Sequence, residues 1–137
     1  MTARGIHHVG IAVADLDSAV ETYRRLFGAE LEHRESVPDQ GVEAACLRIG
    51  TGRIELVASL GPETPVGKFL AKRGPGMHHV AYQVDDIEAT LERLSAAGLR
   101  LIDQTPRIGI RASRVAFLHP STAGGLLTEI VQPAEVH

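Results

Sequence analysis

The chain has 137 residues and a formal net charge of −3, with 14 Lys and Arg residues against 17 Asp and Glu residues. This balance gives no general attraction to nucleic acid or to an anionic membrane, and no apolar stretch approaches the ~20 residues of a membrane-spanning helix. We therefore expect a single domain over residues 1–137. The N-terminus lacks the pattern of a signal peptide, and the one cysteine, Cys46, fits a reducing cytoplasm.

The sequence is nearly repeated at half its length. Gly5-Ile6-His7-His8-Val9 returns 71 residues later as Gly76-Met77-His78-His79-Val80, and Asp15-Leu16 returns at the same spacing as Asp86-Ile87. This period is too long for a solenoid unit. It indicates a duplicated module, with module one at about 5–60, a linker helix at about 61–75 and module two at about 76–133.

In the first half, residues 6–13 alternate as a strand, with a β-branched face and a face of His8, Gly10 and Ala12. A helix follows, with Asp15 or Asp17 as its N-cap and Gly28 at its end. Further strands are predicted near 29–36, 43–49 and 53–59.

The linker contains Thr64-Pro65, which predicts the capped start of a short helix. Three cations lie on it: Lys68, Lys72 and Arg73. They are interpreted either as a solvated helix face or as an anchor for the phosphorylated tail of a ligand.

The second half repeats the strand over 77–84 and the helix, which is capped by Asp85 or Asp86 and closed by Gly98. Strands are predicted near 99–104, 113–118 and 126–132. The element order is therefore β-α-β-β-β twice, which makes the fold class α+β.

Each half carries a histidine in its first strand and a glutamate in its last. The small-residue faces select His8 and His79, although the opposite assignment, with His7 and His78 inward, remains open. Glu55 and Glu129 occupy equivalent places in the repeat. Two imidazoles and two carboxylates without a thiolate favour one divalent metal ion, such as Co, Ni, Zn or Mn.

Ordered motifs along nearly the whole chain resemble the methylmalonyl-CoA epimerase family of the vicinal oxygen chelate superfamily. The motifs are His8-Val9-Gly10-Ile11-Ala12, Pro38-Asp39-Gln40-Gly41-Val42, Ile54-Glu55-Leu56, Gly76-Met77-His78-His79-Val80-Ala81, Pro106-Arg107-Ile108-Gly109, Phe117-Leu118-His119-Pro120 and Gly124-Gly125-Leu126-Leu127-Thr128-Glu129. The resemblance implies two βαβββ modules in a cup-shaped mixed β-sheet with helices on its outer face. It also implies metal ligands at His8, Glu55, His79 and Glu129, often with cobalt, and a homodimer.

The implied activity is epimerisation of (2R)- and (2S)-methylmalonyl-CoA, by proton removal and return at C2 through a metal-stabilised enolate. Glu129 is the first choice for proton transfer and Glu55 the second. Some family members carry a glutamate two residues after Gln-Gly-Val, where this chain has Ala44. Glu43 is an outside candidate that requires a β-bulge. Gln40 and His119 are expected to contact substrate, and His119 has an equally supported structural interpretation.

Three alternatives use the same fold. A glyoxalase I-type lactoylglutathione lyase has the same His/Glu set, but such enzymes usually show Asp-Pro-x-Gly where this chain has His119-Pro120. A drug-sequestering protein generally lacks the metal ligands. An extradiol dioxygenase uses two histidines and one carboxylate, so a fourth ligand speaks against it.

Overall fold

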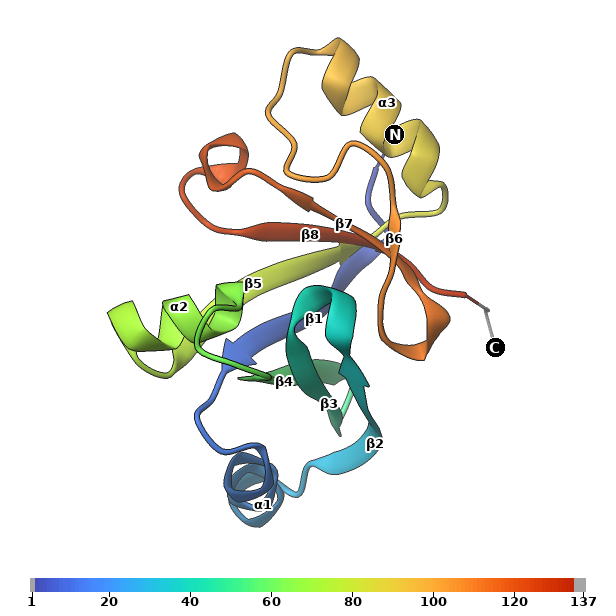
Figure 1. Ribbon diagram of the computed structural model, residues 1–137. Helices are drawn as coiled ribbons and strands as arrows, with labels where there is room; N and C mark the ends of the chain where they lie inside the picture. The colour runs from blue at the N-terminus through green and yellow to red at the C-terminus, as the bar shows by residue number, and fades with distance from the viewer. Residues whose placement is uncertain (1, 135–137) are drawn as a thin grey trace. The chain divides into compact units, whose positions relative to one another are not determined.

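The computed structural model describes residues 2–134 and contains the β-α-β-β-β order twice (Figure 1). Two compact units are present. One is His8–His78, and the other consists of Met1–His7 and His79–His137. The boundaries of these units fall within the first strand of each repeat, not within the linker. Among the described residues, no helix is long and apolar enough to cross a membrane.

The His8–His78 unit holds the strand order β2-β3-β4-β1. Strand β1 pairs in parallel with β4, whereas β2–β3 and β3–β4 are antiparallel. The bounds are β1 Gly5–Ala12, α1 Leu16–Phe27, β2 Glu30–Val37, β3 Val42–Ile49, β4 Gly52–Ser59 and α2 Pro65–Arg73, with the 3₁₀ turn η1 at Pro38–Gln40.

Helix α1 packs on one face of this sheet through Leu16 and Val20, against Ala45, Leu47 and Leu56 of β3 and β4. Its predicted limits are confirmed. The side chain of Asp15 accepts from the backbone N–H of Ser18, and Gly28 ends the helix in a left-handed conformation. Because α1 takes the Leu56 face, the opposite face of the sheet carries Glu55.

The predicted linker helix is α2, and the hydroxyl of Thr64 caps it by accepting from Gly67 N–H. Gly41, which follows η1, has a φ of +68°, and a Cβ placed there would meet Thr64 Cγ2 at 2.5 Å. The Gln-Gly-Val turn therefore requires glycine both for its backbone conformation and for the close approach of the α2 cap.

The second unit holds the strand order β5-β8-β7-β6. Strands β5 and β8 are parallel, and β7 is antiparallel to both β8 and β6. The bounds are β5 Gly76–Gln83, α3 Ile87–Ala96, β6 Arg107–Ile108, β7 Arg114–Leu118 and β8 Thr128–Gln132, with 3₁₀ turns η2 at Ile110–Ala112 and η3 at Pro120–Ala123.

Helix α3 covers one face of this second sheet. Ile87 and Leu91 pack with Ala116, Leu118 and Ile130. Asp86 is the N-cap, its side chain accepting from Ala89 N–H, and the helix ends at Ala96, with Gly98 following at a φ of +79°. The cap choice between Asp85 and Asp86 is thus decided in favour of Asp86.

The strand predicted near 99–104 is wrong. Only Leu101 forms an isolated bridge, to Leu118, and the short strand β6 comes later. The physical reason lies in Asp103, whose carboxylate accepts the N–H of Phe117 at 2.8 Å in place of a strand carbonyl. The N–H groups of Ile102 and Asp103 both bond to the carbonyl of Phe117, so no regular ladder forms.

Candidate metal and active site

The first His/Glu pair lies on neighbouring parallel strands. Glu55 of β4 is in register with Gly10 of β1, and His8 points to the same face. His8 Nε2 lies 3.3 Å from Glu55 Oε2, with side chains 6% and 14% exposed. The pair therefore occupies the face that α1 leaves uncovered.

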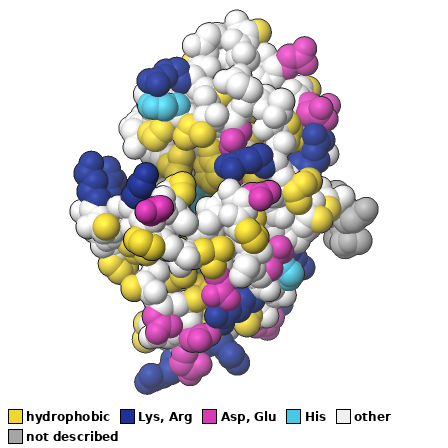
Figure 2. All heavy atoms as spheres, in the orientation of Figure 1, with side chains coloured by type: hydrophobic (Ala, Val, Ile, Leu, Met, Phe, Trp, Pro, Cys, Tyr) yellow, Lys and Arg dark blue, Asp and Glu magenta, His cyan; other side chains and the backbone are white. Residues whose placement is uncertain are grey.

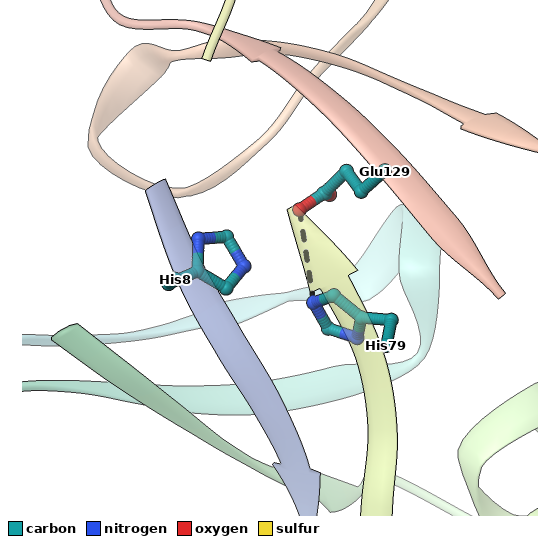
Figure 3. A group of neighbouring side chains, drawn as sticks. All are labelled: His8, His79 and Glu129. Atoms are coloured by element: carbon teal, nitrogen blue, oxygen red, sulfur yellow. Dashed lines mark ion pairs between the residues drawn. The ribbon is translucent and has the colours of Figure 1, made fainter. Parts of the chain in front are cut away.

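The second pair repeats this construction in the other unit. Glu129 of β8 is in register with Ala81 of β5, two residues beyond His79. Glu129 Oε1 points toward the His79 imidazole and lies 3.7 Å from Nε2 (Figure 3). These side chains are 3% and 6% exposed for His79 and Glu129. Each half thus places one buried imidazole beside one carboxylate.

The neighbouring histidines differ in environment. His7 and His78 are half-buried, whereas His8 and His79 are buried. The ring of His78 meets Phe69 edge-on at 5.0 Å between centroids. Burial lowers the pKa of His78, which favours its neutral form. This burial pattern supports the assignment of His8 and His79, not His7 and His78, as the inward pair.

The residues across from the two glutamates are not equivalent. Cys46 of β3 is in register with Glu55, whereas Phe117 of β7 is in register with Glu129. The Phe117 ring meets His79 edge-on at 5.7 Å between centroids. The sequence analysis did not identify Cys46 or Phe117 as a neighbour of the two glutamates. The antiparallel pairing of the predicted strands would have predicted both positions.

Glu43 lies on the opposite face from Glu55. The β3–β4 register is continuous from Val42 to Ile49, so the bulge that this candidate requires is not present there. Arg34 Nε donates to Glu43 Oε2 at 3.1 Å. Glu43 therefore belongs to an ion pair on the α1 side of the sheet, away from His8 and Glu55.

Gln40 and His119 occupy turns. Gln40 ends η1 and is half-buried. His119 is the N-cap of η3, where the backbone N–H of Ser121 donates to His119 Nδ1 at 3.1 Å and the Ser121 hydroxyl lies 2.8 Å from the same nitrogen. These contacts favour the structural interpretation of His119.

The three linker cations share an exposed surface on α2. Figure 2 shows Lys and Arg side chains gathered over this helix, at the left of the view. Lys68, Lys72 and Arg73 are exposed, and the Arg73 guanidinium lies 5.8 Å from the centroid of the Phe69 ring. No described contact ties Lys68 or Lys72 to a carboxylate, so both ammonium groups can receive an anion.

A second His/Glu pair in the first unit escaped the sequence analysis. His33 Nε2 and Glu35 Oε1 of β2 are 2.6 Å apart. Their register partners on β3 are Cys46 and Ala44, which places both on the face of Glu55. The spacing of His33 and Glu35, two residues apart in a predicted strand, could have indicated that they share a face.

Comparisons with known proteins agree with this geometry. A model of the glyoxalase/bleomycin resistance protein/dioxygenase superfamily matches residues 7–117. An ethylmalonyl-CoA/methylmalonyl-CoA epimerase from Cereibacter sphaeroides is 40% identical, over 93% of this chain and 96% of the relative. The chain belongs to the methylmalonyl-CoA epimerase family. The predicted family resemblance is thereby confirmed.

Solved structures of the family support the same assignment. The Mycobacterium tuberculosis methylmalonyl-CoA epimerase is 44% identical with a TM-score of 0.93, covering 97% of this chain and 90% of that one. A methylmalonyl-CoA epimerase in complex with methylmalonyl-CoA and NH4+ is 39% identical with a TM-score of 0.95, covering 99% of both chains. The predicted α+β class with two βαβββ modules is confirmed.

Proposed function

We propose that this protein is an enzyme that interconverts (2R)- and (2S)-methylmalonyl-CoA by removing and returning the proton at C2. The observation that carries the proposal is the buried His/Glu pair that occurs at equivalent places in both halves, at 3.3 Å and 3.7 Å. Membership of the family supports the choice of a coenzyme A thioester as substrate, since one relative is an ethylmalonyl-CoA/methylmalonyl-CoA epimerase and one similar structure is a complex with methylmalonyl-CoA.

We propose that these four side chains hold one divalent cation. Imidazole nitrogen and carboxylate oxygen together suit borderline metals, and cobalt is our first choice, with nickel, zinc or manganese as alternatives. A carboxylate as buried as Glu129 requires a compensating charge or hydrogen bonds, which a cation would provide. His8, Glu55, His79 and Glu129 would hold the ion, and when bound it would act as a Lewis acid toward the thioester oxygen.

Glu129 is the proposed proton-transfer group for one face of C2. Its carboxylate takes the C2 proton and becomes a carboxylic acid, while the electron pair of the broken C–H bond stays in the substrate as an enolate. The burial of Glu129 and the Phe117 ring beside His79 would limit the access of water to the reacting atoms. Epimerisation requires a second group for the other face, for which Glu55 is the candidate, and either glutamate would have to leave the metal, at least partly, to act as a base.

The test is proton exchange at C2. Metal-stripped and cobalt-loaded protein are incubated with one methylmalonyl-CoA epimer in D2O, and deuterium and configuration at C2 are followed. We expect rapid, cobalt-dependent incorporation with loss of stereochemical purity. No incorporation by the cobalt-loaded protein would contradict the proposal, and the hemithioacetal of methylglyoxal and glutathione would be the next substrate.

The cations of α2 are proposed to bind the phosphates of coenzyme A. Replacing Lys68, Lys72 and Arg73 with Ala should raise KM for the thioester and leave kcat nearly unchanged, because these side chains would contact only the non-reacting tail. Replacing the exposed Arg24 and Arg25 of α1 with Ala is the matched control, since it removes charge without touching α2. Equal KM values for the two variants would exclude the anchor.

We also propose that the protein forms a homodimer in the cytoplasm. Light scattering coupled to size-exclusion chromatography should give twice the mass of the chain. A single-chain mass at micromolar concentration would contradict the dimer without affecting the assigned chemistry.

A further inference from the structure

Arg107 lies on the face of the second sheet that carries Glu129. Arg107 of β6 is the register partner of Val115 of β7, and Phe117 is two residues further along β7. Directly opposite residues, and residues two apart in a strand, project from the same side of a sheet. Because Phe117 is in register with Glu129, Arg107 shares the face of Glu129, on the side that α3 leaves uncovered.

Asp103 holds the guanidinium of Arg107 on this face. Arg107 Nε lies 3.2 Å from Asp103 Oδ1, and Arg107 Nη2 donates to Asp103 Oδ2 at 3.4 Å. The same Oδ2 accepts the backbone N–H of Phe117 at 2.8 Å. Asp103 thus ties the position of Arg107 to the strand residue that lies opposite Glu129.

Most hydrogen-bond donors of Arg107 remain available. A guanidinium carries five N–H groups in a planar fork. Within residues 2–134, Asp103 provides the only side-chain hydrogen bond or ion pair of Arg107, and Nε, although close to Oδ1, does not reach hydrogen-bond geometry. The side chain of Arg107 is 39% exposed. The guanidinium can therefore bind a second anionic partner.

The surface beside Arg107 is apolar. Ala81, Val115 and Val131 form a buried cluster on the same face, since Ala81 is the register partner of Glu129 and Val131 is two residues from it. An ion pair beside such a surface is less screened by water than one on an open surface. A carboxylate matches the planar fork of arginine with two parallel hydrogen bonds. The place is therefore suited to a small carboxylate.

We propose that Arg107 binds the free carboxylate of the methylmalonyl group; this inference rests on the proposed function. That carboxylate is bonded directly to C2, so it lies next to the proton that Glu129 is proposed to take. Enolate formation places a further negative charge beside it, and a guanidinium partner offsets the repulsion between the two charges. The phosphates of coenzyme A are at the other end of the substrate, which leaves the carboxylate as the anionic group near C2.

Two thioesters that differ only in this carboxylate test the proposal. One is methylmalonyl-CoA, and the other is its methyl ester, which keeps an acidic C2 proton and coenzyme A but lacks the negative charge. Deuterium incorporation at C2 is measured in D2O with cobalt-loaded wild type and Arg107→Met. The variant should lower kcat/KM for the free acid about 10- to 100-fold and change that for the ester by less than about twofold, so the ratio of the two falls.

Arg114→Met is the matched control. Arg114 is on the adjacent strand β7, its side chain is 36% exposed, and its Nη2 lies 3.0 Å from Oε1 of Glu88 in α3, on the opposite face of the sheet. This variant loses an arginine ion pair of the same kind, so its ratio of kcat/KM values should equal that of the wild type. Arg107→Lys keeps the charge without the planar fork, and its ratio should lie between those of Arg107→Met and the wild type.

The ratio separates a role in substrate binding from a structural role. An unchanged ratio in Arg107→Met overturns the role of Arg107 alone, because damage to the fold or loss of a phosphate contact lowers kcat/KM for both thioesters equally. If Arg107→Met fails to fold, Arg107→Lys replaces it, and a ratio equal to that of the wild type again overturns the role. A wild type that exchanges neither thioester overturns the proposed function, and the role of Arg107 with it.

Discussion

The two halves of the chain build the same His/Glu pair in different surroundings. In the first half Glu55 faces Cys46, with Ala44 two residues along β3, and its side chain is 14% exposed. In the second half Glu129 faces Phe117, which also meets His79 edge-on. The comparison shows a duplicated His/Glu pair in which one copy packs beside an aromatic ring and the other lies beside small residues.

The strands next to these pairs extend the contrast. Strand β2 has eight residues and brings His33 and Glu35 to the face of Glu55. Its counterpart in the second half, β6, has two residues. The first half therefore has additional titratable groups on the face of Glu55, whereas the second half has an aromatic ring, Phe117, directly opposite Glu129.

The largest expected difference between the halves is catalytic. Glu129→Gln should lower kcat about 100- to 10,000-fold even at saturating Co²⁺, because it removes a proton-transfer group. Glu55→Gln should lose less, and added Co²⁺ should restore part of its activity, because holding the ion is the main role proposed for Glu55. Steady-state rates over a cobalt titration measure both. Equal, cobalt-insensitive losses would remove the distinction between the halves.

The free energy of unfolding should also differ between variants of the two residues opposite the glutamates, Phe117 and Cys46. Phe117→Ala should destabilise the protein by about 2–3 kcal/mol, since a half-buried ring that packs on His79 is lost. Cys46→Ala removes only a sulfur atom and should cost about 1 kcal/mol or less. Urea unfolding of the two variants gives the comparison. A larger loss of stability for Cys46→Ala would mean that the residues opposite Glu55 are packed more closely than those opposite Glu129.

Two glycines test the close approach between the Gly41 turn and Thr64, which is described only in the first half. Gly41→Ala should cost about 2 kcal/mol, because a left-handed backbone is strained with a side chain and the new Cβ overlaps Thr64. Gly98→Ala, also at positive φ but with open space around it, should cost about 1 kcal/mol. Thermal unfolding distinguishes them, and equal shifts in Tm would show that Thr64 moves away freely.

The smallest predicted effects concern the elements that the two halves share. Asp15→Ala and Asp86→Ala each remove a side-chain acceptor for the third residue beyond the cap, so each should cost about 1 kcal/mol. Denaturant midpoints should therefore shift equally. A difference of more than about 1 kcal/mol would show that the two helices contribute unequally to stability.

Local patterns explain why most of the fold was predictable. Alternation in β1 and β5, the aspartate caps and Thr64-Pro65 act over a few residues, so their outcome is fixed before distant packing contributes. The segment near 99–104 is different, because the competing partner is the Asp103 side chain, which takes the N–H of Phe117. Apolar spacing in a single segment contains no information about such a contact.

The candidate site could be predicted to about the same extent as the fold. The repeat selected two histidines and two glutamates, because equivalent positions in duplicated modules share a face. It did not select Phe117 or the His33–Glu35 pair, since these depend on strand register and have no counterpart in the repeat. The helix-side position of Glu43 agrees with regular alternation and follows from the absence of a bulge between Val42 and Ile49.

The close approach of Gly41 to Thr64 has a consequence for substrate length. Gln40, expected to contact substrate, directly precedes Gly41, and Thr64 caps the helix whose cations are expected to bind the phosphates, so the close approach brings these two segments together. A side chain at position 41 would push these two segments apart and would therefore change the distance between the two proposed substrate contacts. Truncated thioesters without the nucleotide should then be poor substrates, and a larger residue at position 41 should reduce the preference for the full-length carrier.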